Sequence, residues 1–181
     1  MRLVIAAVVM LLSSTVYGDV LGLRFGMTAD AVRAAKLCKV PAANAAKALL
    51  TCKAVPFAGT KMDAELWLPR TGLARVGFKT RIGMKRGDAE ARADAILNRL
   101  VADYGPVEMT GVGALTTAAA LFDGADWQFT RMKGKLKTAS VFTAKRLPDD
   151  TMQLIGKLIR DREGYAIELA FVSRAVEMQR R

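Results

Sequence analysis

Residues 62–80 read MDAELWLPRTGLARVGFKT, and this stretch carries the clearest fold signal in the chain. Apolar and polar residues alternate on both sides of the turn-forming sequence Pro-Arg-Thr-Gly at 69–72, which is typical of a β-hairpin with one buried face. If the two apolar faces coincide, the register is fixed, because a slip of one residue would move every side chain to the other face. The apolar pairs across the hairpin are then Leu66–Val76 and Ala64–Phe78.

The same register predicts two contacts on the opposite, water-facing side of the hairpin. Asp63 lies across from Lys79 as an ion pair, and Trp67 lies across from Arg75 as a cation–π pair. An exposed Trp67 is a candidate contact residue for a partner, since large aromatics are enriched at interface hot spots. The alternative is that a later element covers Trp67.

Two segments have the features of helices. Asp88 to Tyr104 has a 3.6-residue apolar stripe, and Gly105-Pro106 after it is a strong stop signal. Thr28 is a good N-cap for a helix from about Ala29 to Leu37, which Pro41 would stop. Met27 and Val32 have the spacing of a hydrophobic staple at this helix start.

The rest of the chain is assigned more coarsely. A short strand is expected at 20–25, another turn or two of helix in the alanine-rich 42–50, a hairpin from 126–131 and 138–145, and a final strand at 165–173. Residues 152–160 fit a helix or a strand, and the turn-like sequence after them slightly favours a strand. The fold class is therefore α+β, an antiparallel sheet with helices packed on one face.

The first 18 residues have the order of a secretory signal peptide: Arg2, an apolar run from Leu3 to Leu12, and small residues ending in Gly18. A membrane-spanning helix needs roughly 20 apolar residues, so this run is too short to be one. We expect cleavage after Gly18 and a single periplasmic or secreted domain over residues 19–181. No cysteine lies near the cleavage site, so a lipid anchor is not expected, nor is an integral membrane protein.

The expected mature domain is strongly basic, with 27 Lys and Arg (the chain's 28 less Arg2) against 17 Asp and Glu, or +10. This charge favours an anionic envelope component or an acidic protein as partner, and export argues against nucleic acid. The alternative is that the charge reflects compositional bias and only solvates the surface. The chain also contains no histidine, which excludes Ser–His–Asp and Cys–His catalysis.

The two cysteines, Cys38 and Cys52, are expected to form one disulfide, because their number is even and the compartment is oxidising. The bridge would close a loop of about 15 residues and stabilise the fold by roughly 3 kcal/mol. Two free thiols are the alternative.

The densest basic run is a candidate patch for an anionic partner, and Trp127 and Phe129 directly precede it. A mobile basic hairpin tip is the alternative interpretation. We expect no catalytic, cofactor or metal site. Asp123 and Asp126 lack the ligand count of a calcium loop, and Glu90 and Asp94 are expected on a solvated helix face. The patch consists of Arg131, Lys133, Lys135, Lys137, Lys145 and Arg146.

Two segments resemble the small accessory lipoprotein of the outer-membrane barrel-assembly machinery and the wider group of exported domains with the β-lactamase-inhibitor-like fold. The first is Phe25-Gly26-Met27-Thr28-Ala29-Asp30-Ala31-Val32, similar to that group's Gly-Met-Thr helix start. The second runs from Ala64-Glu65-Leu66-Trp67-Leu68 through Gly72-Leu73-Ala74-Arg75-Val76. The chain departs from the group in lacking a lipidation cysteine and a Leu-Gly-x-Pro after the first helix, and in its large C-terminal half. The resemblance implies helices on an antiparallel sheet and a non-enzymatic role.

Together these features predict a non-catalytic exported binding or accessory module that acts through protein–protein contacts in the bacterial envelope. One alternative is an immunity or inhibitor protein directed against a toxin or hydrolase. Another is a histidine-free carboxylate hydrolase of envelope polymers.

Overall fold

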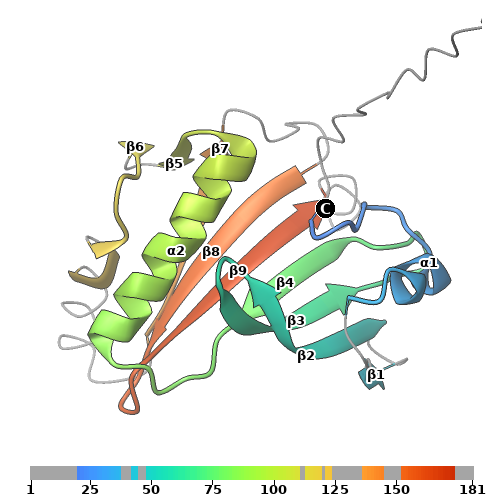
Figure 1. Ribbon diagram of the computed structural model, residues 1–181, viewed down its shortest axis with the longest axis horizontal. Helices are drawn as coiled ribbons and strands as arrows, with labels where there is room; N and C mark the ends of the chain where they lie inside the picture. The colour runs from blue at the N-terminus through green and yellow to red at the C-terminus, as the bar shows by residue number, and fades with distance from the viewer. Residues whose placement is uncertain are drawn as a thin grey trace, which may run out of the picture.

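The protein has an α+β fold in which an antiparallel sheet packs against helices (Figure 1). The computed structural model describes residues 20–37, 42–44, 48–110, 113–119, 121–123, 136–144 and 152–173. For 42–44, 136–144 and 152 it describes the backbone alone. The expected signal peptide and residues 126–131 of the second expected hairpin lie outside these ranges.

In the part of the chain that the structure describes, nine strands form one sheet in the order β1-β2-β3-β4-β9-β8-β7-β5-β6, and every pairing is antiparallel. The C-terminal strand β9 lies in the middle and joins the N-terminal strands to the C-terminal ones. The elements are α1 (Ala29–Ala34), β1 (Ala42–Asn44), β2 (Leu49–Phe57), β3 (Thr60–Trp67), β4 (Arg75–Lys79), α2 (Arg86–Tyr104), β5 (Val107–Met109), β6 (Gly113–Ala114), β7 (Leu136–Ala144), β8 (Met152–Arg160) and β9 (Tyr165–Ser173).

The expected hairpin is confirmed as β3 and β4, with the expected register. Leu66 pairs with Val76 and Ala64 with Phe78, and all four side chains are buried. Trp67 lies across from Arg75, as predicted. The alternation in the sequence determined this register because only one alignment puts both apolar faces on the same side.

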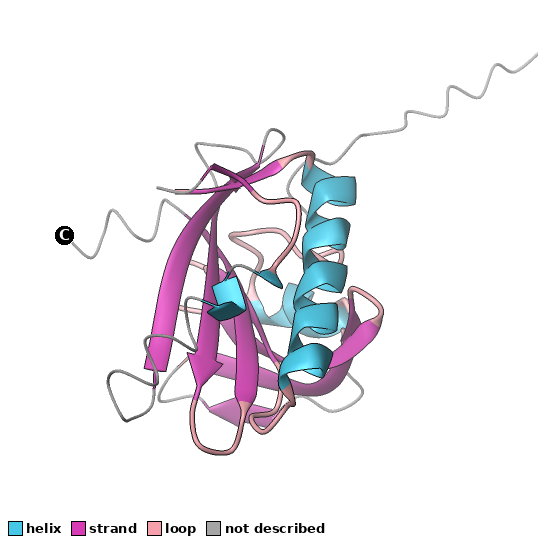
Figure 2. Cartoon of the chain, turned by 90° about the vertical axis from the view of Figure 1, so that its left-hand side faces the viewer, coloured by secondary structure: helices cyan, strands magenta, loops and turns pink. Residues whose placement is uncertain are grey.

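The buried face of the sheet packs against α2, as Figure 2 shows from the side. Its centre is an aromatic cluster: Phe57 stacks on Phe78 with ring centroids 4.3 Å apart, and Phe171 meets Phe78 edge-on at 6.4 Å. Tyr104, in the last turn of α2, lies 5.9 Å from the ring of Phe171. Edge-on and offset rings are the favoured arrangements of aromatic pairs, so this cluster fixes the helix on the sheet.

The two predicted helices are present with small differences at their ends. The N-cap of α1 is Thr28, whose hydroxyl accepts a hydrogen bond from the N–H of Ala31 at 3.2 Å. Val32 is buried in the main core, but α1 ends at Ala34 rather than Leu37, because Lys36 turns to a positive φ of 52°. The second helix, α2, begins at Arg86, two residues before the expected start.

Two local expectations are wrong. Residues 20–25 form a tight turn instead of a strand: Val20 and Leu23 bond to each other through their backbones, and Leu21 and Gly22 between them both have positive φ. The alanine-rich segment 42–50 contains strand β1 and the start of β2 instead of helix. Pairing of β1 with β2, and of β2 with β3, outweighs the helix propensity of alanine here, since propensity is a weak prior against tertiary contacts.

The expected ion pair between Asp63 and Lys79 is also wrong, although the two residues lie across from each other. Asp63 instead accepts from Lys53 at 2.5 Å, and Lys79 pairs with Glu168 at 3.0 Å. A bulge in β2 brings Lys53 and the N–H of Ala54 to Asp63, and the hairpin sequence alone gives no sign of it. The hydrogen bond from Lys53 lowers the pKa of Asp63, while partial burial opposes this shift.

The C-terminal prediction is confirmed, since residues 152–160 form strand β8 and 165–173 form strand β9. The connecting turn is closed by Asp161, whose carboxylate accepts from the N–H groups of Glu163 and Gly164 at 2.9 and 3.2 Å. Thr80 extends the pairing of β4 with β9: its N–H donates to Ile167, and its hydroxyl accepts from the N–H of Ile167 at 2.9 Å.

Candidate functional site

The start of α1 is tied to the turn between β3 and β4 by backbone hydrogen bonds. The N–H of Gly26 donates to the carbonyl of Leu73, and the N–H of Leu73 donates to the carbonyl of Met27, both at 2.8 Å. Gly72 approaches so closely that a Cβ on it would lie 2.4 Å from the carbonyl oxygen of Gly26. Gly72 also has a φ of +99°, which glycine adopts without steric cost.

A groove of about 600 Å³ opens beside this junction. It is lined by residues from three segments, 26–33, 48–50 and 68–72, which come from the start of α1, the start of β2 and the β3–β4 turn. Leu49, Leu50, Leu68 and Pro69 give it apolar walls, and its volume is in the usual range for ligand clefts. The backbone joins two of the walls, since the N–H of Leu68 donates to the carbonyl of Ala48 at 2.7 Å.

The charged side chains that line the groove are both arginines, and none of the described residues lining it is acidic. Arg33 comes from α1 and donates through one guanidinium nitrogen to Asp30 at 2.8 Å. Arg70 is exposed on the turn and has no ion-pair partner in the described part of the chain. The groove therefore combines an apolar interior with a positive rim.

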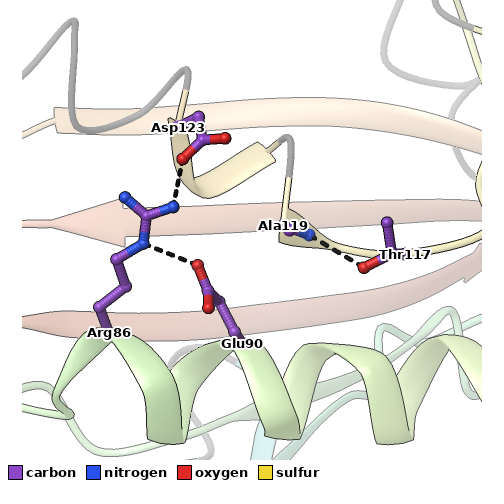
Figure 3. Close-up of polar contacts among 5 residues, drawn as sticks. All are labelled: Arg86, Glu90, Thr117, Ala119 and Asp123. Atoms are coloured by element: carbon purple, nitrogen blue, oxygen red, sulfur yellow. Dashed lines mark hydrogen bonds and ion pairs between the residues drawn. The ribbon is translucent and has the colours of Figure 1, made fainter.

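The acidic residues that a carboxylate hydrolase would need as a catalytic pair are bonded to other groups of the fold. Arg86, at the start of α2, donates to Glu90 at 2.7 Å and also bonds Asp123, as Figure 3 shows. These bonds, the one to Asp123 first, raise the pKa of Arg86, so the guanidinium stays charged. Glu90 and Asp123 thus bond to the same cation. The other half of the expected acidic turn, Asp126, lies outside the described residues.

Asp94 is not the purely solvated residue that its place on the helix predicted. Its carboxylate accepts from the N–H of Ala118 at 2.7 Å and from the hydroxyl of Thr117 at 3.3 Å. Thr117 in turn accepts from the N–H of Ala119 at 3.4 Å (Figure 3). These bonds tie the connection after β6 to α2, so Asp94 has a structural role.

The residues of the predicted basic patch lie outside the part of the chain whose side chains the structure describes. Only the backbone of Lys137 is placed, in β7 opposite Ile159. The patch therefore stays a prediction. Trp67 is half-buried on the face of the sheet opposite α2, so its role as a contact residue also stays a prediction.

The predicted disulfide falls partly outside the described residues, because Cys38 is not among them. Cys52 is buried in β2, and no cysteine among the described residues is a free thiol. The Cys38–Cys52 bridge stays a prediction.

Sequence reasoning did not find the groove, because its walls come from segments up to about 40 residues apart with no shared motif. The feature of the sequence that could have indicated the groove is the pair Gly26 and Gly72. Both lie in the two segments that carry the resemblance, and in the fold these segments contact each other.

Within the described ranges, no three His, Cys, Asp or Glu residues cluster as a metal would require, and no helix is long and apolar enough to cross a bilayer. No curated protein and no solved structure matches the chain. The model of one protein family matches residues 21–141, and the chain belongs to this family, which is described as "Uncharacterised protein".

Proposed function

We propose that this protein is a non-catalytic, exported binding or accessory module of the bacterial envelope that acts through protein–protein contacts. The observation that carries the proposal is the groove between the start of α1, the start of β2 and the β3–β4 turn. It has apolar walls and two arginines at its rim, which suits recognition of another molecule. None of the described residues lining it is a carboxylate, which leaves it without the usual general acid or base of a histidine-free hydrolase.

The position of the carboxylates supports the same proposal. Glu90 and Asp123 bond to Arg86, and Asp94 holds the connection after β6. A carboxylate pair in a glycosidase needs both groups facing one substrate, with one of them protonated near neutral pH. Glu90 and Asp123 instead face one guanidinium, that of Arg86.

Export rests on the N-terminal sequence, and one comparison supports it. The region shared with the family begins at Leu21, directly after the expected cleavage at Gly18. The folded part that relatives share therefore starts where the mature domain is expected to start.

The protein's charge favours an acidic partner. An immunity or inhibitor protein against an acidic toxin or hydrolase is therefore one specific form of the proposed binding module. The chain has a net charge of +11, so an acidic toxin or hydrolase would be attracted to it. An immunity protein makes a distinct genetic prediction: its loss should be lethal only when the toxin is present.

The test is affinity capture from envelope extract with the protein expressed from its full sequence, washed at low and at high salt. One stoichiometric protein partner that survives high salt would support the proposal and identify the pathway. Retention of only anionic lipid or polymer, lost at high salt, would contradict it, because screening removes purely electrostatic attachment. Hydrolysis of purified cell-wall polymer by the protein would equally contradict a non-catalytic role.

A further inference from the structure

The rim arginines of the groove are placed to accept an anionic group. Arg33 uses one guanidinium nitrogen for Asp30, and this pair is exposed, with half of the Arg33 side chain and 92% of the Asp30 side chain accessible. Exposed ion pairs stabilise a fold by little, so Arg33 can bind another carboxylate at small cost. Arg70 is exposed and has no ion-pair partner in the described part of the chain.

The fold holds the backbone segments that carry the two arginines next to each other. Arg33 lies on α1 and Arg70 on the β3–β4 turn, and the two backbone hydrogen bonds at Gly26 and Leu73 join these elements. A site that is held in shape before binding loses less conformational entropy when a ligand arrives. Two arginines on joined elements, with an apolar surface between them, therefore favour a ligand that carries both carboxylates and apolar groups.

A planar guanidinium fits the ligand chemistry of a carboxylate, because it can donate two parallel hydrogen bonds to it. A membrane surface is recognised differently, by clusters of roughly four to eight cations. The described residues that line the groove provide two. A second copy of this chain is also disfavoured as occupant, because the chain carries a net charge of +11 and like charges repel.

The edge of β2 beyond β1 is protected against strand addition, so we place the peptide in the groove. β1 covers β2 at residues 49–51, and the rest of that edge carries a bulge at Lys53 and Ala54 and then Pro56. A bulge, a lysine and a proline are the features that protect edge strands from pairing with other chains.

We propose that this groove binds an acidic peptide segment of a partner protein, with its carboxylates on Arg33 and Arg70 and its apolar side chains between Leu49, Leu50 and Leu68. The inference rests on the proposed function, since it names the partner chemistry of the same site. It goes further in assigning affinity to two arginines that contribute little to the fold.

The test is a selection of displayed random heptapeptides on the protein expressed from its full sequence. We expect enrichment of peptides in which Asp or Glu alternates with apolar residues. Binding of the selected peptides should weaken by about tenfold or more in Arg70→Glu, because a charge-assisted hydrogen bond is lost and a repulsion is added. Arg33→Gln should weaken it in the same direction.

The matched control is Arg162→Glu, which makes the same change in net charge at an exposed site. Arg162 lies in the β8–β9 turn, while the groove lies near the opposite end of β9, where Ser173 bonds to Ala74. The strand between them is about 27 Å long. The control variant should bind the selected peptides as the unchanged protein does.

Three results would overturn the inference: no enrichment of peptides, enrichment without acidic residues, or equal binding by Arg70→Glu and Arg162→Glu. Sedimentation with vesicles of three parts phosphatidylcholine to one part phosphatidylglycerol provides the lipid arm. Vesicle binding that depends on Arg70, without peptide enrichment, would assign the groove to a headgroup instead. If affinity capture retains a protein partner equally well with Arg70→Glu, the proposed function stands and the groove inference fails.

Discussion

Replacing Gly72 by alanine should destabilise the protein by more than the backbone strain of the substitution alone. At a φ of +99° an L-residue pays a backbone strain of about 1–2 kcal/mol. The new Cβ would also lie 2.4 Å from the carbonyl oxygen of Gly26, and backbone atoms cannot rotate away as a side chain can. The two segments must therefore separate, and the hydrogen bonds at Gly26 and Leu73, both 2.8 Å, are weakened or lost.

Each of these hydrogen bonds contributes about 1 kcal/mol, so the total loss in the free energy of unfolding is about 2–4 kcal/mol. For a chain of this length, a loss of about 3 kcal/mol lowers Tm by roughly 6–12 °C. Urea unfolding followed by circular dichroism measures the change, with calorimetry as an independent check.

Gly59→Ala is the matched control for this variant. Gly59 has a φ of +71°, and nothing lies within 4 Å of a Cβ built on it. Its replacement should cost only the backbone strain of about 1–2 kcal/mol. If the variants at Gly72 and Gly59 lose equal stability, the contact with Gly26 contributes nothing and the reasoning is refuted.

Three other changes test separate contacts. Asp94→Ala should cost about 1–2 kcal/mol in urea unfolding through the bond to the N–H of Ala118, while Asp94→Asn, which keeps an acceptor, should cost less. Thr80→Val should cost about 1–3 kcal/mol because a buried N–H of β9 loses its acceptor, and Thr80→Ser, which keeps the hydroxyl, should cost less; a smaller loss for valine than for serine would contradict this. The lowered pKa of Asp63 makes its stabilisation fully present above about pH 4 and lost as the pH falls through that lowered value. Lys53→Met should raise this pKa in an NMR titration, and an unchanged pKa would show that Lys53 is not its cause.

The hairpin and the final strand β9 could be predicted from the sequence because each carries its own pattern, whereas residues 152–160 fitted a helix as well as a strand and only the turn after them favoured β8. The alternation at 62–80 determined the pairing of Leu66 with Val76, and a turn signal marked where β8 ends and β9 begins. Local features also identified Thr28 as a cap, since capping depends only on a side chain and the next three residues.

The errors arose where a distant strand decided the outcome. Asp63 and Lys79 were correctly placed opposite each other, but Lys53 and Glu168 from two other strands became their partners. Residues 42–44 and 49–50 became strand because their neighbours in the sheet offered hydrogen bonds that a short alanine helix cannot match. The sequence of a segment does not indicate which distant strand becomes its neighbour in the sheet.

The candidate site could not be predicted for the same reason, but the two glycines that join its walls are visible in the sequence. Gly26 and Gly72 bring α1 and the β3–β4 turn together, and one contact between them both stabilises the fold and shapes the groove. A glycine variant would therefore change stability and binding at once and could not separate the two. Arg70 is exposed on the same turn. It contributes a positive charge to the groove and has little effect on folding. The variant at Gly72 should mainly change stability, and the variant at Arg70 should change binding alone. Two variants only two residues apart in one turn can therefore distinguish a structural junction from a recognition site.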